Sequence, residues 1–158
     1  VTPEAVAMGA DLARHAKRSV AVASLDEERR ALQSAKGLPD VVVLGCPHAS
    51  RDEISGIEKL LAGRRAQVPV WIFTSQESRA AAEKDGSAVR LERSGALLLA
   101  DTCMVVASLA ELGIRNVATD SAKAAFYLPS HQSIGVSFIP REAALEAAVA
   151  GTWAGAAA

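Results

Sequence analysis

Reactive side chains gather in the stretch DVVVLGCPHAS, residues 40–50. A run of β-branched and apolar residues ends at a glycine and is followed closely by Cys46, His48 and Ser50. Thiolates select zinc, copper(I) or iron–sulfur centres, and a histidine can act as a ligand, a general acid or a substrate clamp. Both residue types also have structural roles, because most free cysteines are small buried hydrophobes. The stretch therefore indicates a reactive site whose chemistry depends on what lies beside it.

The second cysteine, Cys103, lies in DTCMVV and follows the apolar run ALLLA. Asp101 and Thr102 precede it, either as turn formers or as groups that shape the cysteine loop or meet a substrate. Two thiolates are too few for the usual four-thiolate iron–sulfur cluster, so further ligands would lie outside this chain or one iron would stay open. A mononuclear zinc site of Cys46, Cys103 and His48, with one open position, is an alternative.

A third polar cluster, TDSAK, contains Ser121 and Lys123 at the start of a predicted helix. Free backbone N–H groups and a lysine at such a position suit a carboxylate or a phosphate. The competing role for Ser121 is a helix cap. The same competition applies to Ser50, which forms a capping-box pattern with Glu53, and to Ser75, which follows the run VPVWIFT.

These clusters all follow predicted strands. Runs of β-branched and apolar residues predict strands at 19–23, 41–44, 68–74, 96–100, 116–119 and 133–138. Capping and helix-stop signals predict helices at 2–14, 25–35, 51–62, 76–86, 87–94, 107–112, 121–127 and 140–150. Strands that alternate with helices predict an α/β fold with a mostly parallel sheet and helices on both faces. Ligands bind outside the carboxyl ends of the strands in such sheets, so we expect the polar clusters to share one crevice.

Composition narrows the class of protein. The 158 residues, 50% of them hydrophobic, can form one domain with its own core, expected over 1–153 with a frayed tail at 154–158. A net charge of −1 without a basic stripe argues against nucleic acid and anionic membranes as partners. No apolar run is long enough to span a bilayer. Two cysteines make no disulfide framework, which predicts a reducing compartment such as the cytoplasm. A start at Val1, directly on a helix, suggests a piece of a longer polypeptide.

Four motifs carry a resemblance to a known family. DVVVLGCPHAS, VWIFTS, ADTCMVV and ATDSAKAAFYLP, in this order and at this spacing, resemble the catalytic region of the aconitase X family, from Val1 to about Trp153. The resemblance implies an aconitase-like domain from the C-terminal part of that region, and a hydro-lyase activity. Bacterial and fungal members dehydrate cis-3-hydroxy-L-proline, and archaeal members dehydrate a mevalonate phosphate. The alanine- and arginine-rich composition favours a bacterial source, and hence the hydroxyproline or a similar small hydroxy acid.

The resemblance also implies a cofactor and partners. The family uses an iron–sulfur centre held by three cysteines, two of which fall on Cys46 and Cys103, and the third lies in an N-terminal portion outside this chain. The implied partners are the rest of the catalytic unit and a small swivelling domain, either fused or as a separate subunit.

Roles for single residues follow from the same resemblance. Ser121 resembles the serine that acts as base in aconitase relatives, and Lys123 is expected to stabilise it or to hold the substrate carboxylate. His48 is expected to hydrogen-bond the substrate hydroxyl or the cluster. The groups expected around the substrate are Ser50, Ser75, Asp101 and Thr102.

Two residues depart from the family pattern. The family commonly has Asn where Asp120 stands and His where Phe126 stands. Asp120 places a negative charge beside the expected carboxylate site unless a cation balances it, and Phe126 removes a polar group. A second hypothesis is that this chain is a truncated, non-catalytic α/β domain that binds a partner or oligomerises. The missing third cysteine is the feature that discriminates between the two hypotheses.

Overall fold

A parallel sheet forms the centre of the molecule. The structure, a computed structural model, describes residues 3–18 and 20–153, so the tail expected at 154–158 lies outside the described residues. The strands are β1 (Val41–Ala49), β2 (Val70–Thr74), β3 (Ala96–Ala100), β4 (Asn116–Thr119) and β5 (Gly135–Phe138). They pair in the order β3-β2-β1-β4-β5, and every pair is parallel. The predicted α/β fold class is confirmed.

Helices connect the strands and precede them. They are α1 (Pro3–Met8), the 3-10 helix η1 (Gly9–His15), α2 (Asp26–Ala31), α3 (Arg51–Leu61), α4 (Gln76–Lys84), α5 (Ser87–Arg93), α6 (Ala122–Gln132) and α7 (Arg141–Ala150). The predicted caps explain where three of them begin, because Ser50, Ser75 and Ser121 accept backbone N–H groups of the first turns of α3, α4 and α6.

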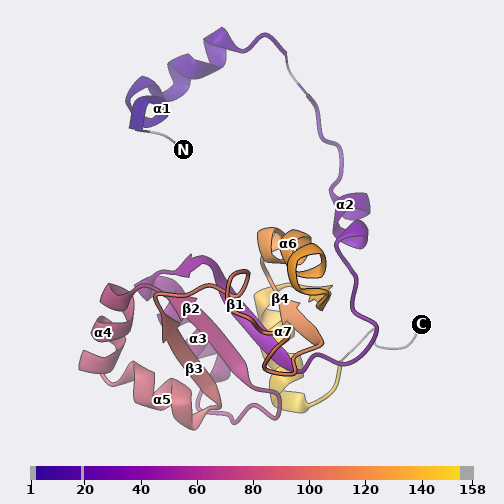
Figure 1. The fold of residues 1–158 in the computed structure, drawn as a ribbon. Coiled ribbons are helices and arrows are strands. Elements are labelled where there is room, and N and C mark those ends of the chain that lie inside the picture. Colours follow the sequence, from indigo (N-terminus) through magenta and orange to yellow (C-terminus); the bar gives the residue numbers. More distant parts are fainter. Residues whose placement is uncertain (1–2, 19, 154–158) are drawn as a thin grey trace.

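The two faces of the sheet bury separate cores. On one face, Val42, Leu44 and Ile72 pack with Ile54 of α3 and Leu145 of α7, and α4 and α5 add further small and branched side chains. On the other face, side chains of β1, β2, β4 and β5 pack with α6 and with the loop that follows β3. The steps from β1 to β2 and from β2 to β3 cross the sheet in one direction, and the step from β3 to β4 crosses it in the other. Because connections between parallel strands are right-handed, the connection from β3 to β4 must lie on the opposite face. The sheet is therefore covered on both sides, as α3 and α6 show in Figure 1.

Two predicted elements are wrong. Of the strand predicted at 19–23, residue 19 lies outside the described residues, and residues 20–23 form no strand and are all exposed, although their alternating valines favour one. A strand needs a neighbouring strand to bond its backbone, and this segment lies outside the sheet. Residues 107–112 form turns instead of a short helix, and the 25–35 helix ends early, at Ala31.

The N-terminal segment stands away from the sheet. Figure 1 shows α1 and η1 at one end of a long extended connection, with α2 between them and the sheet. Each residue from 4 to 31 whose exposure is described is exposed. In the described part of the chain, no helix combines the length and the apolar character needed to cross a bilayer.

Candidate active site

The centre of the sheet contains a point where the chain reverses direction. Strands β1 and β4 are neighbours, and α3 leaves the carboxyl end of β1 toward one face while α6 leaves that of β4 toward the other. Open α/β sheets bind ligands outside the carboxyl ends of the strands at such a point. The segments that flank it are 45–50 and 119–123, both of which the sequence singles out.

Gly45 ends the regular part of β1. Its φ is +87°, and a Cβ there would lie 2.0 Å from the carbonyl oxygen of Phe73, so only glycine fits. The register between β1 and β2 shifts between Leu44 and Ala49, so residues 45–48 form a bulge in the ladder. Such bulges near the ends of strands redirect side chains, and this one turns the end of a buried strand into an accessible segment.

The two cysteines lie near the carboxyl ends of the strands. Both are half-buried free thiols. Burial raises the pKa of the Cys46 thiol, and the neighbouring Cys103 thiol raises it further, whereas the Ser121 hydroxyl and the Lys123 ammonium oppose the rise. Cys103, Ser121 and Lys123 thus all lie close enough to Cys46 to interact with it, whereas a shared crevice for a substrate stays a prediction.

Backbone groups orient the Cys103 thiol. Its sulfur accepts the N–H of Val105 at 3.3 Å, and its carbonyl accepts the N–H groups of Val106 and Ala107. Asp101, just after β3, has a φ of +59°, which supports its role in turning the chain. The result is a tight loop with the thiol at its start.

His48 is tied to the same loop. Its Nε2 lies 2.7 Å from the carbonyl oxygen of Thr102. A carbonyl oxygen only accepts, so Nε2 carries the proton and Nδ1 is the acceptor of the neutral ring. Among the residues that the structure describes, no three His, Cys, Asp or Glu side chains are grouped to hold a metal. Cys46, Cys103 and His48, the ligands of the zinc alternative, are therefore not grouped as a metal site.

Ser121 combines two contacts. Its Oγ accepts the N–H of Ala124 at 3.1 Å as the cap of α6 and donates to the carbonyl oxygen of Cys46 at 2.7 Å. The residue is 7% exposed. Lys123, the second residue of α6, is exposed. The serine hydroxyl is thus held at a helix N-terminus, beside the first cysteine.

Ser50 and Ser75 both act as caps. Ser50 forms a full capping box with Glu53, and its backbone N–H holds the pKa of the Glu53 carboxyl below the ordinary value, with Arg141 adding to the effect. Ser75 accepts the N–H of Ser78 at 3.2 Å. A further role of Ser50, Ser75, Asp101 and Thr102 toward substrate stays a prediction.

Sequence reasoning missed Arg141. Its Nε donates to Asp120 at 2.7 Å and its Nη2 to Glu53 at 3.1 Å, which links the starts of α3, α6 and α7. The signal was Asp120 itself, because a carboxylate at this place needs a cation, and Arg141 supplies it. Phe126, the second departure, is 64% exposed on α6 and packs edge to face on Tyr127.

The donor set fits part of an iron–sulfur site. Thiolates are the protein ligands of such clusters, and Cys46 and Cys103 offer two of them side by side. Burial raises the pKa of the Cys46 thiol on balance, so the thiolate form that a metal requires would come from metal binding itself, which releases the thiol proton. The chain can therefore hold two corners of a cluster and needs ligands from elsewhere for the rest.

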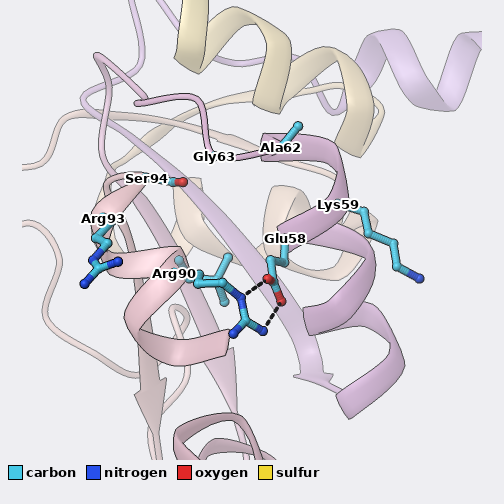
Figure 2. Close-up of a pocket in the computed structure, with 8 residues that line it drawn as sticks. Glu58, Lys59, Ala62, Gly63, Arg90, Arg93 and Ser94 are labelled. Atoms are coloured by element: carbon cyan, nitrogen blue, oxygen red, sulfur yellow. Dashed lines mark hydrogen bonds and ion pairs between the residues drawn. The ribbon is translucent and has the colours of Figure 1, made fainter. Parts of the chain in front are cut away.

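A separate cavity lies toward the amino ends of the strands. It has a volume of about 440 Å³ and lies between the C-terminal ends of α3 and α5 (Figure 2). The helices of such a fold end near the amino ends of the strands, so the cavity is remote from the cysteines. Its Glu58 and Arg90 are already joined by an ion pair. The cavity therefore contributes no reactive group to the site around Cys46 and Cys103.

Comparisons with known proteins agree with the motifs. The family model "Aconitase X third domain" matches residues 39–150. A cis-3-hydroxy-L-proline dehydratase from Pseudomonas aeruginosa is 36% identical over 159 residues, which covers 96% of this chain and 27% of the relative. A phosphomevalonate dehydratase large subunit from Methanocaldococcus jannaschii is 38% identical over 114 residues, which covers 72% of this chain and 28% of the relative.

A solved structure shows the same likeness. The holo-form of Thermococcus kodakaraensis aconitase X superposes with a TM-score of 0.72 at 31% sequence identity, covering 78% of this chain and 32% of that chain. The chain thus spans roughly a quarter to a third of the length of the relatives it matches.

Proposed function

Because the chain belongs to the aconitase X family, we propose that it is part of an iron–sulfur hydro-lyase that dehydrates a small hydroxy acid. The first candidate substrate is cis-3-hydroxy-L-proline, since a dehydratase of that substrate aligns with 96% of the chain. The observation that supports the proposal is that Cys103 and Ser121 both interact with Cys46 near the carboxyl ends of the central strands. The activity belongs to the whole protein, of which this chain would supply one domain.

Cys46 and Cys103 would hold two corners of the cluster. When bound, the cluster supplies a Lewis acid that makes the departing hydroxyl a better leaving group. The half-buried position of both thiols limits the access of water to the ligands. The third cysteine ligand would come from the rest of the catalytic unit.

Ser121 would act as an alkoxide, after its own proton has passed to solvent, and take the proton beside the substrate carboxylate. A serine is a very weak base, so its oxyanion needs stabilising donors. The N–H of Ala124 and the N-terminal end of α6 already face its Oγ, and the positive charge of Lys123 lies in the same turn. The hydroxyl must first release the Cys46 carbonyl that it now bonds. Lys123 would also pair with the substrate carboxylate.

His48 would bind the substrate hydroxyl. Since Nε2–H is used by the Thr102 carbonyl, Nδ1 is the atom available to accept from a substrate O–H. The bond to Thr102 fixes the ring relative to the Cys103 loop. We propose that Asp101 and Thr102 set the shape of this loop and that Ser50 and Ser75 border the substrate.

Phosphomevalonate is the second candidate substrate. Arg141 is shared between two carboxylates, Asp120 and Glu53, and Lys123 in the first turn of α6 supplies a second positive charge, so this group of charges favours neither candidate. The relatives named as phosphomevalonate dehydratase large subunits, at up to 38% identity, are the reason to keep the second candidate.

The test uses the full-length protein together with any separate small subunit. We expect anaerobic reconstitution to give an iron–sulfur cluster and dehydration of cis-3-hydroxy-L-proline in preference to phosphomevalonate. Cys46→Ser and Cys103→Ser should each lose most of the bound iron, because serine is a poor ligand for these clusters. Iron and sulfide analysis with absorption spectroscopy measures this loss.

Met104→Leu is the matched control. It removes a sulfur next to Cys103 from a fully buried side chain, at a cost below about 1.5 kcal/mol, and leaves both thiols in place. Full iron content in either cysteine variant would refute the ligand assignment. A wild-type protein with no iron and no dehydratase activity would favour the second hypothesis, a non-catalytic domain that binds a partner or oligomerises.

A further inference from the structure

The two ends of α6 form hydrogen bonds to the two segments that carry the cysteines. At the first end, the Ser121 hydroxyl donates to the Cys46 carbonyl oxygen at 2.7 Å. At the other end, the side chain of Gln132, the last residue of α6, bonds to the loop that follows Cys103. The helix buries one face against the sheet, so it is a fixed support between the two segments.

The Gln132 amide uses its full set of N–H donors on this loop. Its Nε2 donates to the carbonyl oxygens of Met104 and Val105 at 3.1 and 2.9 Å, and its Oε1 accepts the N–H of Leu109 at 2.9 Å. Only a primary amide presents two donors and an acceptor at one side-chain end. Glutamate has the same shape, but a carboxylate oxygen takes the place of the NH2 group. Glutamate therefore offers no N–H donor and cannot replace glutamine here.

Val105 connects this clamp to the thiol. Its carbonyl accepts from Gln132, and its N–H donates to the Cys103 sulfur at 3.3 Å. The turn that presents Cys103 is therefore held from the far side by one side chain. The Cys103 side chain in turn interacts with that of Cys46.

We propose that Gln132 is a positioning residue that fixes the Cys103 thiol beside Cys46. This inference rests on the proposed function for its consequence, which is that Gln132 sets the separation of two cluster ligands. The placement of the thiol itself does not depend on a metal and is measured without one.

The test compares Gln132→Glu with Gln67→Glu in the full-length enzyme. Gln67 is a matched control, because its Nε2 also donates to two carbonyl oxygens, those of Val149 and Ala150, at 3.2 Å each. It lies just before β2, at the amino edge of the sheet, away from the cysteines. Both variants place a carboxylate against two backbone carbonyls.

The first readout is alkylation of each cysteine by iodoacetamide in the metal-free enzyme, followed by mass spectrometry. We expect about tenfold faster modification of Cys103 in Gln132→Glu, because the loop loses two hydrogen bonds and gains a repulsion, with no change in Gln67→Glu. Cys46 is the internal reference. The second readout is the half-life of bound iron in the reconstituted enzyme, which should shorten only in Gln132→Glu.

Equal Cys103 alkylation rates in the two variants would overturn the proposal. If Gln132→Glu does not fold, Gln132→Met takes its place under the same criterion, since methionine keeps the length without a charge facing the carbonyls. If Cys103 becomes accessible in the variant while the wild-type enzyme holds no iron, the positioning role is supported and the iron–sulfur function is refuted. If iron binds and Cys103 stays protected, the function stands and the positioning role falls.

Discussion

At the scale of single residues, Ser121 has a structural and a proposed chemical role in the same atom. Its Oγ caps α6 through the Ala124 N–H and bonds the Cys46 carbonyl. Loss of a serine cap alone costs about 1 kcal/mol of stability. Loss of a general base costs about 10²–10⁴-fold in turnover. The two roles are therefore separable by the size and kind of the effect.

We expect Ser121→Ala in the full-length enzyme to lower the turnover number by about 10²-fold or more while its unfolding free energy falls by about 1 kcal/mol. Steady-state kinetics and urea unfolding measure the two quantities. Ser121→Thr is the control, because threonine keeps both a hydroxyl and a capping side chain. Near-normal turnover in Ser121→Ala would remove the base assignment and leave only the cap.

At the scale of elements, the bulge at the end of β1 depends on Gly45. An alanine there would combine a strained positive φ with a Cβ that meets the Phe73 carbonyl oxygen at 2.0 Å. We expect Gly45→Ala to destabilise the chain by roughly 3 kcal/mol or more, as the sum of backbone strain and overpacking. Since the bulge carries Cys46, iron content should fall with it. Chemical denaturation and iron analysis are the measurements.

Gly56 provides the contrast within the next element. It lies in α3, and nothing lies within 4 Å of the position a Cβ would take. Gly56→Ala should stabilise the chain by about 0.5–1 kcal/mol, because alanine has the better helix propensity and glycine loses more entropy on folding. If both substitutions had the same effect, the close contact at Gly45 would not be what shapes the end of β1.

The elements that the sequence predicts well are those with local signals. The capping box of Ser50 and Glu53 and the valine run 41–43 specify α3 and β1 without help from distant residues. The exposed valines at 20 and 22 carry the same local signal as a strand, but no neighbouring strand pairs with them. Residues 107–112 form turns because their backbone bonds to the Gln132 side chain and to nearby carbonyls, which no local pattern reveals.

The residues of the candidate site also fall into those that the sequence predicts and those that only the fold reveals. The sequence places Cys46, Cys103 and Ser121 after strands, and parallel pairing brings those strand ends to one edge. Arg141 and Gln132 act through side-chain contacts between elements far apart in the chain. Such contacts depend on how helices pack, so they follow from the fold and not from any spacing along the sequence.

At the scale of the whole molecule, residues 33–35 form hydrogen bonds to the edge strand β5. The backbone N–H groups of Ser34 and Ala35 donate to the Val136 carbonyl at 2.9 and 3.0 Å, and the Ser34 hydroxyl accepts the Val136 N–H. Gln33 bonds the N–H and carbonyl of Phe138. Edge strands expose unpaired backbone groups, and these residues cover those of β5. Leu32 packs against one core cluster, and the described residues before it contribute no side chain to either cluster.

Two truncations of the 158-residue chain separate these segments. Removal of residues 1–31 should change the unfolding free energy by less than about 0.5 kcal/mol, because the described side chains it removes are exposed. Removal of residues 1–35 should cost about 2–4 kcal/mol, because it strips the hydrogen bonds from β5 and removes the partly buried Leu32 from the core. Urea unfolding measures both values, and light scattering reports whether the uncovered edge pairs with a second chain. Equal stability of the two truncated chains would show that residues 32–35 do not protect the sheet, and a large loss in the shorter truncation would show that the extended N-terminal segment packs on the domain in solution.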